Sequence, residues 1–222
     1  LLDAVRFARD CSLADAISWA DRWLGGTAPS TPRKISAPLN VDDDADRRLA
    51  DARRMWAEAN PIWHTAAETY LRDVRGIAAA AWPPELVRWH GAMGAVLFAA
   101  TTATGELKAV QRIYLNADGT PRLDDEGRKI KRTRGVLADT AVRFPGKANA
   151  PLVLAEGPET AASCWHATGF ETWANLGSMA KAPLASVPIT RTVIVARDDD
   201  PRNAPSRKAL RDAIRRWRAE GR

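Results

Sequence analysis

The sequence predicts an α/β protein, α+β overall, in which helices flank a parallel sheet. Three features of the 222 residues indicate this. From Pro151 onward, short apolar runs alternate with helical patterns, and strands separated by helices are typical of parallel sheets. Before that, strand-like runs follow one another, and much of the first third carries the apolar spacing of helices. We therefore expect helices first, then a β-rich part, then an α/β part.

The first part of the chain predicts helices joined by a linker. Apolar residues recur at near-helical spacing from 2 to 24, and Ser12 is suited to cap the second of two short helices. Three prolines and few apolar side chains lie between 27 and 38, which is typical of a linker. A polar helix at 44–60 and another at 64–74 are expected to follow.

The middle of the chain predicts a hairpin with further strands. The run 95–101 is apolar, and 107–115 alternates well enough to be its partner. Residues 116–119 end on the Asp-Gly signal of a tight turn, and 129–131 and 141–144 are further strand candidates.

The last third predicts alternating strands and helices. We expect strands at 152–155, 172–174 and 192–197, and helices at 158–168, near 178–185 and at 205–219. A parallel unit normally returns to its sheet after a helix, so the sequence is expected to stop inside or just before a further strand. It also begins without Met, as a piece of a longer protein would.

Two of the predicted strands end on carboxylates. Glu156 follows the first, and Asp198, Asp199 and Asp200 follow the third. In open α/β sheets, ligands bind at the carboxyl ends of the strands. Asp198 and Asp200 are two residues apart, so in extended backbone their side chains point to the same face. Glu156, Asp198 and Asp200 therefore predict a site for one or two Mg²⁺, or Mn²⁺, which supports phosphoryl or nucleotidyl transfer. Alternatively, a run of three aspartates is often a solvated turn or helix cap.

The charge of the chain suits a nucleic-acid partner. The formal charge is +6 and the isoelectric point about 9.7. Basic side chains of the β-rich part are candidates to neutralise phosphates, and Tyr114 is a candidate to stack a base. The candidates for nucleic-acid or nucleotide binding are Lys108, Arg112, Lys129, Lys131, Arg132, Arg134 and Arg143. A solvated hairpin is the alternative for these residues, and a solvated face is the alternative for the basic last helix.

Other classes of protein find little support. The two cysteines, Cys11 and Cys164, have no CxxC partner, so neither a disulfide framework nor a zinc site is expected. No apolar run approaches the roughly 20 residues that span a bilayer, and no signal peptide is evident, which predicts a cytoplasmic protein without membrane contact. The three histidines are scattered, and no phosphate-binding Walker A sequence is present.

Three motifs of the last third resemble a Toprim domain. They are residues 155–161 (AEGPETA), 175–178 (NLGS) and 193–200 (VIVARDDD). This domain is shared by bacterial-type primases, type IA and II topoisomerases and some nucleases. The resemblance implies that Glu156, Asp198 and Asp200 are catalytic and bind the metal ion. The glycine expected shortly after Asp-x-Asp is missing, and residues 201–205 (PRNAP) stand there.

The upstream sequence is similar to Toprim primases of the phage and plasmid type. Residues 67–77 (AETYLRDVRGI) resemble the "YL…RGI" segment ahead of the primase core, and residues 2–16 resemble the final helices of a primase zinc ribbon, without its cysteines. The resemblance implies that residues 1–26 are the helical remnant of a zinc-ribbon-type domain and that residues 27–45 are a linker. Residues 46–150 would then form the helical and β-rich part of the primase core. Residues 151–222 would form a Toprim domain, which the end of the sequence would truncate.

The activity implied by this resemblance is that of a DNA primase. Such an enzyme makes short RNA primers from nucleoside triphosphates on a single-stranded DNA template, in phage, plasmid or mobile-element replication. Its partner is a replicative helicase, in the same or a separate chain. Two alternatives stay open: a Toprim nuclease acting on DNA, and a non-catalytic DNA-binding module. A topoisomerase would need a catalytic tyrosine, and neither Tyr70 nor Tyr114 has a recognisable context.

Overall fold

A computed structural model of the chain describes residues 12–23, 41–147, 149–199 and 204–222. These residues fall into two compact units, 1–40 and 41–222. In the first unit, Ser12 Oγ accepts a hydrogen bond from the Asp15 amide at 3.2 Å and caps α2 (Leu13–Trp23), as predicted. The helix predicted before residue 12 and the prolines of the predicted linker lie outside the described residues. No helix within the described ranges is long and apolar enough to cross a membrane.

Two helical segments open the second unit. Helix α3 (Val41–Ala57) starts three residues before its predicted beginning, so residues 41–45, assigned above to the linker, are helical. Helix α4 (Ala66–Thr69) continues as the π-helix η1 (Tyr70–Val74), in which the Arg75 amide donates to the Tyr70 carbonyl five residues earlier. The helix predicted at 64–74 is confirmed, but its wider final turn was not predicted. Such turns often occur at functional sites.

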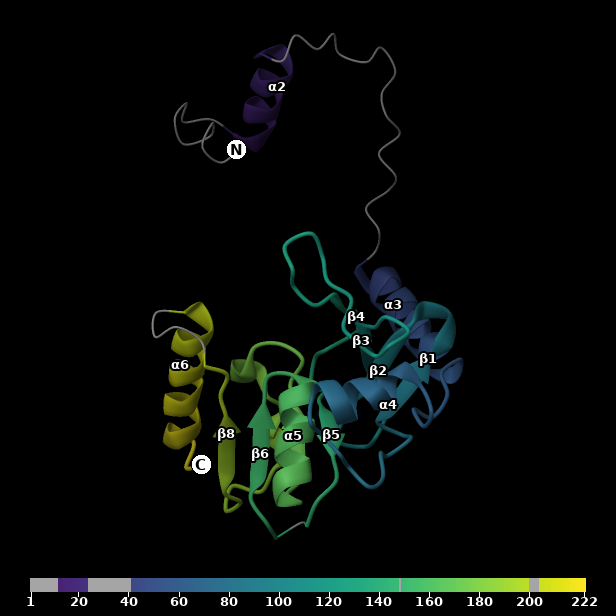
Figure 1. Cartoon of the computed structure of the whole chain (residues 1–222). Coiled ribbons are helices and arrows are strands. Elements are labelled where there is room, and N and C mark those ends of the chain that lie inside the picture. Colours follow the sequence, from purple (N-terminus) through teal and green to yellow (C-terminus); the bar gives the residue numbers. More distant parts are fainter. Residues whose placement is uncertain (1–11, 24–40, 148, 200–203) are drawn as a thin grey trace. The chain divides into compact units, whose positions relative to one another are not determined.

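An antiparallel sheet follows, in the order β1-β2-β3-β4. Its strands are β1 (Val87–His90), β2 (Ala95–Thr101), β3 (Leu107–Tyr114) and β4 (Lys131–Gly135). The β2–β3 hairpin and the turn at 116–119 are confirmed, and the Gly119 amide donates to the Asn116 carbonyl at 3.1 Å. Strand β1 was not predicted, because its four residues (VRWH) include Arg and His and do not form an apolar run. Helix α3 packs across β3 and β4 (Figure 1).

Gly135, at the end of β4, is required by its backbone and by its neighbours. Its φ is +114°, and a Cβ there would lie 2.1 Å from the Lys108 carbonyl oxygen. We expect Gly135→Ala to lower the free energy of unfolding by about 2–4 kcal/mol, from backbone strain and from a clash that no side chain can relieve. Urea unfolding measures this. Gly127→Ala is the control, because Gly127 also has a positive φ (+75°) but nothing within 4 Å of a new Cβ. Equal losses in both variants would contradict the role of the clash.

A second, mixed sheet has the order β5-β7-β6-β8. Its strands are β5 (Val142–Phe144), β6 (Leu152–Ala155), β7 (Thr172–Ala174) and β8 (Val193–Ala196). The last three strands were predicted and pair in parallel, whereas β5, from before residue 151, is antiparallel to β7. Ala155 is in register with Ala174 and with Ala196, so the three parallel strands end at the same level.

Helices cover both faces of the second sheet. Helices α5 (Pro158–Thr168) and α6 (Pro205–Ala219) have the predicted bounds. The helix predicted near 178–185 consists of two short 3₁₀ turns, η3 (Met179–Lys181) and η4 (Leu184–Ser186), separated at Pro183, which lacks a backbone donor. The chain is therefore mixed α/β with two sheets and several helices, as the sequence predicted in outline.

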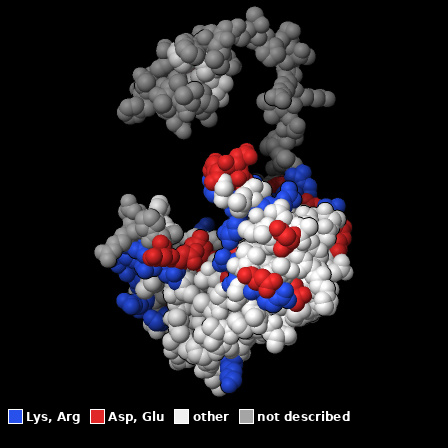
Figure 2. Space-filling model, viewed as in Figure 1, with Lys and Arg blue, Asp and Glu red and all other residues white. Residues whose placement is uncertain are grey.

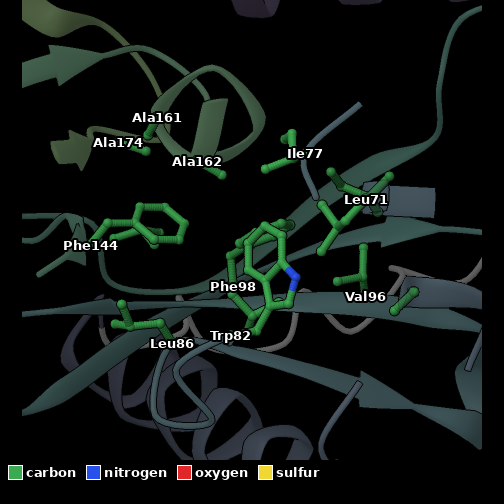
Figure 3. Packing of buried hydrophobic residues seen from close by; sticks show 14 of the residues in the cluster. Leu71, Ile77, Trp82, Leu86, Val96, Phe98, Phe144, Ala161, Ala162 and Ala174 are labelled. Carbon is green, nitrogen blue, oxygen red and sulfur yellow. The ribbon is translucent and has the colours of Figure 1, made fainter. Parts of the chain in front are cut away.

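Alternation along β6 explains this arrangement. Leu152 and Leu154 pack in one cluster with Trp217 of α6, whereas Ala155 packs in another with Ala161 of α5. The small residues let α5 approach the sheet closely. The cluster on the α5 side also includes Phe98 and Leu71 from the first half of the unit, so one core joins the two sheets (Figure 3).

Candidate functional site

The carboxyl ends of the parallel strands bring two predicted site residues together. Glu156 follows β6 and Asp198 comes two residues after β8, and these strands are neighbours with level ends. The loop after β7 is tied to this edge, because the amides of Asn175 and Leu176 donate to the carbonyls of Ala155 and Glu156, both at 3.0 Å. The third predicted residue, Asp200, lies outside the described residues.

Glu156 and Asp198 line one cavity of about 210 Å³. Glu156 is half-buried and Asp198 is exposed, and the Thr160 hydroxyl lies 3.5 Å from Asp198 Oδ1. The wall is built from the ends of β6 and β8, the loop after β7 and the start of α6. Its residues are Glu156, Gly177, Ser178, Met179, Arg197, Asp198, Ser206, Arg207 and Leu210.

The donor set of this cavity suits a hard divalent cation. Mg²⁺ is commonly held by one or two carboxylates together with water and substrate phosphates, and the cavity offers two carboxylates in an open setting. Within the part of the chain that the structure describes, no group of three or more His, Cys, Asp or Glu side chains is close enough to form a full protein ligand set. Glu156 and Asp198 are the carboxylates of this cavity that could hold such an ion together with water.

Acidic and basic side chains gather around this edge of the second unit. In Figure 2, acidic atoms lie above the ends of β6 and β8, next to basic atoms over α6. Further basic atoms lie across a hollow in the surface, on the side of β4. Charges of both signs therefore lie near this edge of the sheet on the face that Figure 2 shows.

A buried ionic cluster lies one helical turn from Glu156. Glu159 is 5% exposed and accepts from Lys129 Nζ at 2.6 Å and from the Tyr70 hydroxyl, and its carboxylate is 3.1 Å from Arg75 Nε. Burial by itself would raise the pKa of Glu159, but these hydrogen bonds and cations outweigh it and the pKa is lowered. Burial and the adjacent carboxylate raise the pKa of the Tyr70 hydroxyl far above its usual range. The cluster fixes the start of α5, and with it the turn that carries Glu156.

Sequence reasoning missed this cluster. The sequence places Glu159 in the AEGPETA motif at a helix start, and Lys129 in a strand candidate and among the nucleic-acid-binding candidates, but it does not connect the two residues. Tyr70 and Arg75 belong to the segment that resembles "YL…RGI", which was the available signal. Their separation from Glu159, 89 residues in the case of Tyr70, leaves no periodic trace in the sequence.

Most of the predicted basic residues have protein partners. Lys108 pairs with Glu106 at 3.0 Å, and Arg134 pairs with Asp51 of α3 at 2.5 Å. Arg143 stacks 3.8 Å from the centre of the Trp173 ring, and burial lowers its pKa.

The seven residues do not share one surface. Arg112 and Arg132 are directly opposite each other on β3 and β4, whereas Lys131, next along β4, points to the other face. Arg112 lies against Met55 of α3 and the Tyr114 ring. Lys131 and Arg132 are exposed, so they are the members of the set best placed to meet a ligand.

A family model matches the helical and antiparallel part of the second unit. The family described as a domain of unknown function, DUF7146, matches residues 46–144. This range extends from α3 to β5 and includes the antiparallel sheet, Tyr70, Arg75 and Lys129, but not the carboxylate cavity. No curated protein shows a significant match to the chain.

Proposed function

We propose that the chain is the catalytic core of a magnesium-dependent DNA primase, a nucleotidyltransferase that makes short RNA primers on single-stranded DNA. One observation carries the proposal: Glu156 and Asp198, at the level ends of adjacent parallel strands, line a single cavity. The Toprim-like motifs support it, because their glutamate and first aspartate fall on these two residues. The similarity of residues 67–77 to primases favours primer synthesis over other Toprim chemistry.

The residues of the site have separate tasks in this proposal. Glu156 and Asp198 would hold Mg²⁺, with Asp200 as a further ligand that the resemblance implies. A Mg²⁺ ion held there would supply Lewis-acid chemistry: a lower pKa for an attacking 3′-hydroxyl and stabilisation of negative charge on the leaving pyrophosphate. The cluster around Glu159 keeps α5 in place, so that the Glu156 carboxylate is positioned before the substrate arrives.

The basic part of the unit would hold the template. Lys131 and Arg132, exposed on β4, are proposed to contact backbone phosphates, which gives affinity that is independent of sequence and falls steeply with salt. As the resemblance implies, a replicative helicase in the same or another chain would be the partner.

The proposal is tested by incubating the chain with single-stranded DNA, MgCl₂ and labelled nucleoside triphosphates. Short labelled RNA products would support primer synthesis. Shortened DNA would instead favour a nuclease, because the same carboxylates can serve an attack by water. DNA binding without either product, and without an effect of Mg²⁺ on thermal stability, would favour the non-catalytic module.

A further inference from the structure

The cavity that contains the two carboxylates also has a basic wall. Arg197 comes directly before Asp198, and Arg207 lies in the first turn of α6; both line the cavity. Carboxylates suit a divalent cation, and guanidinium groups suit phosphate oxygens, which they bind through two parallel hydrogen bonds. We propose that Arg207, assisted by Arg197, binds the phosphate chain of a metal-bound nucleoside triphosphate. This inference rests on the function proposed for Glu156 and Asp198.

Arg207 is held in place but its hydrogen bonding is incomplete. Its side chain is 11% exposed, and its Nε is buried without a hydrogen-bond partner among the described residues. Its ion pair with Asp199 measures 3.4 Å, and the Asp199 side chain is fully exposed. An ion pair with a fully hydrated partner contributes little, so a phosphate can replace it readily. The guanidinium is therefore held at the cavity wall with only a weak ionic partner, and its outer N–H groups can be shared with a phosphate oxygen.

The position of Arg207 on α6 also favours the binding of a phosphate group. Helix α6 has 15 residues, and Arg207 is the third of them. The start of a helix carries partial positive charge from its aligned peptide dipoles, which favours an anion in the same place. The arginine and the helix start therefore act in the same direction at the cavity wall.

The size of the cavity indicates which part of the nucleotide it takes. Its volume of about 210 Å³ is below the roughly 300–1,000 Å³ of sites that enclose a whole small molecule. A second cavity of about 490 Å³ shares Gly177 and Ser178 with it and is also lined by Asn175 and Lys181. The first cavity thus suits the metal ion and phosphates, and the nucleoside has room to extend into the second.

Isothermal titration calorimetry tests the proposal by measuring how tightly the chain binds inorganic tripolyphosphate in the presence of MgCl₂. We expect Arg207→Gln to weaken this binding by about tenfold or more, as for the loss of a charged hydrogen-bond donor. Arg215→Gln is the matched control, because Arg215 is on the same helix, is 80% exposed and lines neither cavity. The Arg215→Gln variant is expected to bind tripolyphosphate with the wild-type affinity. Wild-type affinity in Arg207→Gln, or no binding by the wild-type chain, would overturn the proposal.

A second variant separates geometry from charge. Arg207→Lys keeps the positive charge but loses the planar fork, so a loss of about threefold or more is expected. If Arg207→Gln does not fold, Arg207→Lys is the variant that tests the role of Arg207. Wild-type affinity of Arg207→Lys for tripolyphosphate would then overturn the proposal. Primer synthesis separates the two ideas: tripolyphosphate binding through Arg207 without primers refutes only the proposed function. The opposite result is that Arg207→Gln makes as many primers as the wild type at limiting nucleotide and binds tripolyphosphate equally well. That result refutes only the role of Arg207.

Discussion

Replacing Glu156 by Gln, or Asp198 by Asn, is expected to reduce primer synthesis by about 100-fold or more, because each change removes a metal ligand and the charge stabilisation that depends on it. The fold should persist. Both side chains lie at strand ends, Asp198 is exposed, and the replacements have nearly the same shape. Labelled primers measured at saturating Mg²⁺ give the activity, and circular dichroism gives the fold.

Thermal unfolding in the presence of Mg²⁺ gives a readout that does not depend on activity. An ion that binds only the folded state raises the unfolding temperature. Mg²⁺ should therefore stabilise the wild-type chain and should have a smaller effect on either variant. Each variant is also measured without metal, so that any loss of the side chain's own contacts is separated from the loss of the Mg²⁺ effect. Asp212→Asn is the control, because Asp212 is exposed on α6 and lines no part of the cavity.

Unchanged primer synthesis by Glu156→Gln or Asp198→Asn would rule out the assignment of the site.

Replacing Glu159 by Ala is expected to lower the free energy of unfolding by about 2–4 kcal/mol at pH 7, because it leaves Lys129, Arg75 and the Tyr70 hydroxyl without their shared acceptor. This loss lies around and below the lower end of the roughly 3–5 kcal/mol for broken buried ion pairs, since both cations keep part of their hydration. Urea unfolding measures it. Glu126→Ala is the control, because the Glu126 side chain is 68% exposed in its pair with Arg128, and little change is expected there.

The pH dependence provides an independent check of the same cluster. The pKa of Glu159 is lowered in the folded state, so its contribution to stability is present above the ordinary value of 4.5 and is lost as the pH falls through the lowered pKa. The difference in stability between wild type and Glu159→Ala should be largest near neutral pH and should shrink below about pH 4.5. A difference that stays constant between pH 7 and pH 3 would show that Glu159 contributes by packing rather than by charge.

Much of the last third of the fold was predictable because its signals are local. The strand and helix bounds at 152–155, 158–168 and 205–219 agree with the structure, since apolar runs, prolines at helix starts and glycines at helix ends act within a few residues. Strand β1 was missed because its four residues (VRWH) are not a continuous apolar run, unlike those of β6. The π-helical turn at Tyr70 was missed because its wider winding accompanies a tertiary contact with Glu159.

The basic residues show the limit of composition as a guide. Lys108, Arg134 and Lys129 were grouped by charge and nearness in sequence, but each has an acidic partner in the fold. Glu106 is close in sequence to Lys108, whereas Asp51 and Glu159 come from distant helices. A count of charges does not record such pairing, since a cation that is neutralised within the protein has the same letter as one that is exposed.

The sequence by itself determined which residues end the parallel strands, and so placed Glu156 and Asp198 at the end of their strands. Only the tertiary structure decided that β6 and β8 are neighbours, that Arg207 shares the cavity with the two carboxylates, and that Glu159 is buried among cations from the other half of the unit. The physical reason is the range of the interactions. Periodicity and capping act within a few residues, whereas strand order and buried ion pairs join segments that are tens of residues apart and have no local pattern in common.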